Sequence, residues 1–179
     1  VLVRVPNESF AQAAGTSLDT MMDFFFSATL RDWKKEAQRY RELKDVFEAA
    51  TDVQIVGKDT DVSFSTKGRT YAVGDGTINM PDGEIYTAPV DDSIEGHIYF
   101  DFPGVYASKL IPGIRLQFEN GEVVNASADD NEDLLHELIR MDDGARRIGE
   151  FGVGTNYGID RYSYDILYDE KIGGTVHLA

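Results

Sequence analysis

The order of hydrophobic and polar positions divides the chain into a helical first part and a strand-rich remainder. Two stripes of apolar residues at helical spacing follow Pro6: Leu18, Met21, Met22 and Phe25, then Leu30, Trp33, Ala37, Tyr40 and Phe47. Thr16 to Asp19 has the form of a capping box, with an acidic residue three positions after the threonine. Asp32 is a second candidate cap, so one long helix or two helices are expected before Ala50. The Met and Phe cluster is interpreted as core rather than as a cofactor site.

From Asp52 onward apolar residues alternate with polar ones, which is typical of half-buried β-strands. Short strands are predicted over Val53–Val56, Val62–Ser65, Tyr71–Val73, Ile85–Pro89 and Ile94–Phe102. The turn residues Lys67-Gly68 predict that the second and third of these strands form a hairpin. The clearest hairpin lies further on, where Ile114–Glu119 continues through Asn120-Gly121 to Val123. Asn-Gly is the dipeptide preferred in type I′ turns.

The last third of the chain mixes acidic runs, one helix and several glycines. Asp129–Asp133 places carboxylates at the start of a helix, where they complement its dipole. This acidic run lacks the ligand spacing of a calcium loop. The buried stripe of the helix is Leu134, Leu135, Leu138 and Ile139. Ala145–Gly149 is expected to resume the helix for one turn, and Ile166–Tyr168 to form a strand.

These patterns predict an α+β fold. A helical segment over residues 1–51 precedes a mixed, largely antiparallel, β-rich domain with one or two helices over residues 52–179. The length of 179 residues suits one ordinary domain, or one domain with a piece of a second. The first residues, Val1–Val5, are expected to form a short strand.

Composition excludes several classes of function. With 32 acidic and 17 basic residues the net charge is −15, which argues against nucleic acid and anionic membranes as partners. No apolar run approaches the roughly 20 residues that span a bilayer. Without cysteine there are no disulfides or thiolate sites, and a cytoplasmic setting is favoured.

Few residues are candidates for chemistry. The chain has no cysteine and no G-x-S-x-G motif, so nucleophilic catalysis has little support. Of the histidines His97, His136 and His177, only the last follows an acidic pair, a lysine and a Gly-Gly turn within eleven residues, in the sequence DEKIGGTVHLA. Glu84, Glu150 and Glu170 stand with it among glycines and turns, and this donor set suits a divalent metal. A surface role for any one of these glutamates, and a structural role for the histidine, remain open.

Three separated blocks together carry a specific resemblance. They are NMPDGEIYTAPVDDSIEG at residues 79–96, GARRIGEFGVGTN at residues 144–156 and DEKIGGTVHLA at residues 169–179. In this order and spacing they resemble the aminopeptidase T and aminopeptidase S family, the thermophilic metalloprotease family of metal-dependent aminopeptidases. The resemblance implies that residues 1–51 end an N-terminal domain and that residues 52–179 are the front of a catalytic domain. The chain is then expected to be an internal fragment, with a family tyrosine and a His-x-Asp motif beyond Ala179.

The resemblance also implies roles for four residues. Glu84 matches the first metal-binding glutamate, Glu150 the second, which bridges two ions, and His177 a metal-binding histidine. Glu170 matches a family glutamate that is either a ligand or a proton carrier. Two divalent ions (zinc, cobalt or manganese), peptide substrates, a homodimer and a cytoplasmic location are the further expectations.

The implied reaction is hydrolysis of the N-terminal peptide bond by metal-activated water, and the 179-residue piece alone is expected to be inactive. Two alternatives are kept. One is a non-catalytic binding or assembly module that retains the family fold. The other is an acidic α+β domain without an active centre, for which the three blocks would be coincidence.

Overall fold

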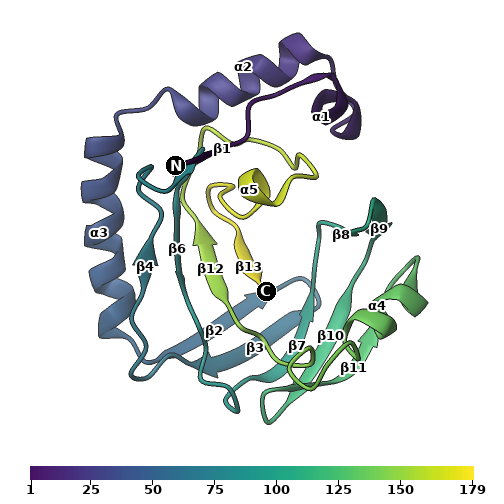
Figure 1. Cartoon of the computed structure of the whole chain (residues 1–179). Coiled ribbons are helices and arrows are strands. Elements are labelled where there is room, and N and C mark those ends of the chain that lie inside the picture. The colour runs from purple at the N-terminus through teal and green to yellow at the C-terminus, as the bar shows by residue number, and fades with distance from the viewer. The chain divides into compact units, whose positions relative to one another are not determined.

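Two main sheets organise the chain, each in its own unit (Figure 1). The structure, a computed structural model, describes all 179 residues. The first unit contains Val1–Ala49, Thr70–Thr87 and Phe151–Leu178, and the second contains Ala50–Arg69, Ala88–Glu150 and Ala179. Helices and mostly antiparallel sheets confirm the predicted α+β class. The division between residues 51 and 52 stays a prediction.

Three helices open the first unit: α1 (Glu8–Ala13), α2 (Leu18–Thr29) and α3 (Trp33–Ala49). The prediction that Thr16 begins the capping box of α2 is wrong by one residue. Ser17 has the extended backbone of an N-cap, and its Oγ accepts a hydrogen bond of 3.2 Å from Thr20 N. Asp32 Oδ1 accepts from Lys35 N at 3.2 Å, so the region forms two helices. None of the helices is both long and apolar enough to cross a membrane.

The sheet of the first unit is antiparallel, with the strand order β13-β12-β6-β4. Its strands are β4 (Ala72–Val73), β6 (Glu84–Thr87), β12 (Phe151–Gly154) and β13 (Val176–Leu178). Helix α3 packs beside β4 and β6 (Figure 1). A parallel pair of β1 (Leu2–Val3) and β5 (Asn79–Met80) lies in the same unit.

The predicted hairpin of residues 62–73 does not form, because β4 pairs with β6 instead. Tyr71, at the start of the returning segment, is 2% exposed, and its ring lies 5.5 Å from that of Phe47 on α3. This aromatic contact favours placing the segment with α3 in the first unit.

The core of the first unit is rich in aromatic side chains from its helices. The rings of Phe10 and Phe24 each lie 5.4 Å from the ring of Tyr168. Tyr168 belongs to α5 (Ile166–Asp169), so the strand predicted at Ile166–Tyr168 is wrong. Asp165 caps this helix by accepting a hydrogen bond from Leu167 N, and the adjacent residues Leu167 and Tyr168 are both buried. A strand would have placed these two neighbours on opposite faces.

The second unit has a five-stranded antiparallel sheet with the order β11-β10-β7-β3-β2. Its strands are β2 (Asp52–Gly57), β3 (Thr60–Ser65), β7 (Glu95–Tyr99), β10 (Arg115–Glu119) and β11 (Glu122–Ser127). The hairpin of β8 (Gly104–Tyr106) and β9 (Lys109–Ile111) and helix α4 (Glu132–Leu138) complete it. Asn120 and Gly121 have φ values of 50° and 78°, which confirms the type I′ turn predicted between β10 and β11.

The helical turn predicted at Ala145–Gly149 is absent. Arg146 instead covers the edge of β11 at Val123. Its carbonyl accepts from Val123 N at 2.9 Å, and its guanidinium donates to Val123 O through Nε and Nη2. Pairing with a strand edge satisfies backbone groups that a helix would have satisfied internally.

Asn156 is fully buried and joins three segments of the first unit. Its Nδ2 donates to Ala28 O at 3.0 Å and to Asp82 O at 2.8 Å, while its Oδ1 accepts from Gly158 N at 2.9 Å. Its backbone N–H donates to Lys171 O at 3.0 Å. The side-chain amide of Asn156 thus joins α2 to the turn before β6, and its backbone N–H holds the segment after α5.

We expect Asn156→Ala to lower the free energy of unfolding by about 3 kcal/mol, because it leaves buried carbonyls of Ala28 and Asp82 without their donor. Urea unfolding followed by circular dichroism measures the change. Asn125→Ala is the matched control, since Asn125 is exposed on β11, and its effect should stay within about 0.5 kcal/mol. Equal effects of the two substitutions would contradict this role for Asn156.

Candidate metal centre

The strand register places Glu84 and His177 on one face of the first-unit sheet, and Glu150 is the last residue of the second unit before β12 begins. Glu84 of β6 lies opposite Gly154 of β12, and His177 of β13 lies opposite Gly152. Side chains two residues apart on a strand point to the same face. The face that carries Glu84 and His177 is therefore the one toward which Glu150, two residues before Gly152, also points.

Glu150 directly precedes β12, and its position follows from the pairing of β12 with β13. Its N–H donates to Ala179 O at 2.8 Å, and its carbonyl accepts from Ala179 N at 3.0 Å. These bonds extend the ladder by one residue pair beyond Phe151 and Leu178. The second predicted glutamate is thus held by backbone bonds rather than by a flexible loop.

The glycine on the middle strand gives the histidine its space. A Cβ atom on Gly152 would lie 2.1 Å from His177 Nε2, far inside contact distance. Glu84 and His177 come from the two strands that flank β12, so their side chains approach each other across it. The glycine-rich sequence of β12 therefore leaves room for the imidazole between the carboxylates.

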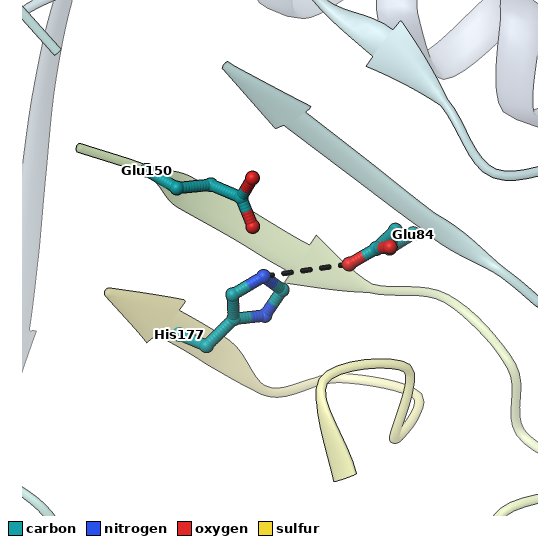
Figure 2. A group of neighbouring side chains, drawn as sticks. All are labelled: Glu84, Glu150 and His177. Carbon is teal, nitrogen blue, oxygen red and sulfur yellow. Dashed lines mark ion pairs between the residues drawn. The ribbon is translucent and has the colours of Figure 1, made fainter. Parts of the chain in front are cut away.

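Three of the four predicted site residues converge in Figure 2: Glu84, Glu150 and His177. One ligand atom from each lies within 4.8 Å of the others. The dashed line in Figure 2 marks the distance of 3.4 Å between His177 Nε2 and Glu84 Oε2. Two carboxylates and one imidazole form a donor set that suits a divalent transition metal.

Glu84 is a buried carboxylate whose surroundings fit a bound cation. Its side chain is only 7% exposed, and burial raises its pKa, an effect that the neighbouring Lys171 ammonium opposes. Oε1 pairs with Lys171 Nζ at 2.9 Å, but the buried Oε2 has no hydrogen-bond donor. A buried carboxylate oxygen without a donor is costly, and a metal ion at the three-donor group would satisfy it.

Glu170 lies near this group but is not one of the three converging donors. It follows α5 as the C-cap residue, with its side chain 22% exposed. Its Oε2 accepts from Lys171 Nζ at 3.1 Å. Glu170 is therefore connected to Glu84 through the lysine, since the same Nζ atom contacts both carboxylates.

Sequence reasoning did not identify two buried charged residues beside the site. Lys171 is 1% exposed between the two glutamates, and Asp82, also 1% exposed, holds the turn before Glu84. Asp82 Oδ2 accepts from Gly76 N and Oδ1 from Gly83 N, both at 3.0 Å. Both residues lie inside the blocks that carried the family resemblance. Membership of these blocks was the sequence signal that could have identified them.

The other two histidines lie in the second unit. His97 is exposed on β7. His136 lies on α4 with its Nε2 3.8 Å from Glu132 Oε1. Neither belongs to the three-donor group.

Comparisons with known proteins show which family the chain resembles. The family model described as thermophilic metalloprotease (M29) matches residues 1–179. Aminopeptidase 2 of Geobacillus stearothermophilus is 26% identical over 206 aligned positions, covering 99% of this chain and 49% of that protein. Aminopeptidase T of Thermus thermophilus is 38% identical over 105 positions, covering 56% of this chain and 25% of that protein.

The solved structure of wild-type AmpT from Thermus thermophilus has a similar fold. Its TM-score is 0.79 at 24% identity, covering 90% of this chain and 45% of that one. The chain therefore spans half or less of the length of these relatives.

We expect Gly152→Ala to displace the imidazole of His177 and to weaken divalent metal binding at least tenfold, because the new methyl group takes the space of Nε2. Calorimetric titration with Zn²⁺ measures the affinity, and circular dichroism checks the fold. Gly57→Ala is the control, since a Cβ there meets nothing closer than 3.9 Å. Unchanged affinity in the folded Gly152→Ala protein would contradict the arrangement.

Proposed function

This chain belongs to the thermophilic metalloprotease family M29, and on that premise we propose that it forms part of an aminopeptidase that removes N-terminal residues from peptides. The observation that carries the proposal is the convergence of Glu84, Glu150 and His177 within 4.8 Å. The names of the relatives support the same enzyme class. Use of a divalent metal follows from the family and agrees with the donor set.

We further propose that Glu84, Glu150 and His177 hold a divalent ion, with Glu150 shared between two ions in the complete centre. Zinc, cobalt and manganese all suit carboxylate and imidazole ligands. A bound ion of this kind lowers the pKa of water and polarises a carbonyl group. A homodimer and a cytoplasmic setting belong to the same proposal.

The proton carrier in this proposal is Glu170. Its Oε2 is held by Lys171, which orients the carboxylate and leaves Oε1 as the atom that accepts a proton from water. The same oxygen then delivers the proton to the leaving amine. The partial exposure of the Glu170 side chain, 22%, agrees with a group that meets substrate. Lys171 restrains this carboxylate from one side only, because it contacts a single oxygen.

The ligand assignment predicts the outcome of metal titrations. Glu84→Gln and His177→Ala should each weaken binding of Zn²⁺, Co²⁺ or Mn²⁺ by about 100-fold or more, since each removes a direct ligand. Isothermal titration calorimetry gives affinity and stoichiometry. Glu119→Gln and His97→Ala are matched controls at exposed positions of the second unit and should bind as the parent chain does. Normal binding by both ligand variants would place the metal elsewhere.

The role of Glu170 predicts a different pattern. In a protein of the relatives' length that carries this segment, Glu170→Gln should keep its metal content and lose activity by a factor on the order of 10² to 10⁴. Release of nitroaniline from aminoacyl p-nitroanilides measures the rate, and elemental analysis measures the metal. Loss of metal with the rate would make Glu170 a ligand instead.

The 179 residues alone, supplied with metal, should release no product above the blank. A protein of full length that binds metal but releases no amino acids would favour the non-catalytic binding module.

A further inference from the structure

Lys171 is a buried lysine that lies between the carboxylates of Glu84 and Glu170. Lys171 is 1% exposed, and its Nζ lies 2.9 Å from Glu84 Oε1 and 3.1 Å from Glu170 Oε2. Lysine is rarely buried to this extent without charged partners, because removing an ammonium from water is costly. Lys171 has such partners, because its Nζ lies within ion-pair distance of two carboxylate oxygens.

The backbone fixes the lysine in this position. Lys171 N donates to Tyr168 O at 3.0 Å as α5 ends, and Lys171 O accepts from Asn156 N at 3.0 Å. Asn156 is itself fully buried and bonded to α2 and to the turn before β6. These backbone hydrogen bonds thus hold the segment that carries the Lys171 ammonium in place within the first unit.

The contacts of Lys171 divide the oxygens of Glu84 between two partners. Oε1 faces the ammonium, while Oε2 faces His177 Nε2 at 3.4 Å, inside the three-donor group. A carboxylate held in this way offers a metal one oxygen rather than two. The carboxylates of Glu84, Glu150 and Glu170 carry three negative charges. The Lys171 ammonium reduces the net charge of these four side chains to −2.

We propose that Lys171 is a resident counter-cation and positioning residue of the centre, which restricts Glu84 to one ligand oxygen and moderates the affinity for divalent ions. This inference rests on the proposed function for the identity of the ion. Its first consequence concerns the protein without metal, where the ammonium is the cation that stabilises the two carboxylates. Its second consequence is that a metal ion binds against the repulsion of a neighbouring positive charge.

The metal-free protein provides the first test. In EDTA, Lys171→Met should lower the unfolding midpoint by about 10 °C, because it leaves buried Glu84 without its partner. The double variant Lys171→Met with Glu84→Gln should recover about half of that loss, since the buried charge is removed as well. Lys34→Met, at an exposed position of α3, is the control for loss of a lysine charge. A double variant no more stable than Lys171→Met would overturn the counter-cation role.

Metal titration provides the second test. Lys171→Met, compared at a temperature where it is folded, should bind Zn²⁺ at least about tenfold more tightly than the parent chain, because both oxygens of Glu84 become available and a positive charge is lost. Thermal scans with Zn²⁺ should show a larger stabilisation for the variant than for the parent. A structural lysine would lower stability without raising metal affinity. Equal or weaker binding by the folded variant would overturn the inference.

The two proposals fail in different ways. If neither the parent chain nor Lys171→Met binds metal, the ligand assignment and the moderating effect of Lys171 on metal affinity both fail. The counter-cation role is then still decided in EDTA by the double variant. If the parent binds metal and Lys171→Met binds it equally, the ligand assignment stands and the inference about Lys171 fails.

Discussion

The antiparallel register of β6, β12 and β13 is the constraint on which the candidate centre depends. It sets Glu84 opposite Gly154 and His177 opposite Gly152, so that both side chains share the face of Glu150. A shift of one residue in either pairing would turn a ligand to the other side of the sheet. The glycines of the middle strand then provide the room in which the flanking side chains meet.

Burying charged side chains at this face of the first-unit sheet costs stability. Carboxylates and an ammonium are buried where a core would ordinarily place apolar side chains. Asp82 and Asn156 compensate by satisfying backbone groups of the turn before β6 and of the neighbouring segments. The aromatic cluster of α1, α2 and α5 stabilises the same unit through apolar packing, and this packing supports the segments that carry the polar site.

Local patterns predicted the elements that depend on local chemistry. The Asn120-Gly121 turn follows from neighbouring residues, and the Asp32 cap decided between the one long helix and the two helices that the sequence had left open. The hairpin pairing predicted for Tyr71–Val73 and the strand predicted at Ile166–Tyr168 were wrong because distant contacts decided the outcome. Tyr71 packs against Phe47 of α3, and Tyr168 packs against Phe10 and Phe24, which no window of neighbouring residues contains.

By itself the sequence determined the α+β class, the family, and a short list of carboxylates and histidines able to hold a metal. It did so because helix and strand periodicity and the three family blocks can be read from the order of residues alone. Only the tertiary structure decided that Glu84, Glu150 and His177 meet while Glu170 is reached through Lys171. That arrangement arises from strand pairing and burial across more than ninety residues of sequence, and no local preference of Lys171 or Gly152 encodes it.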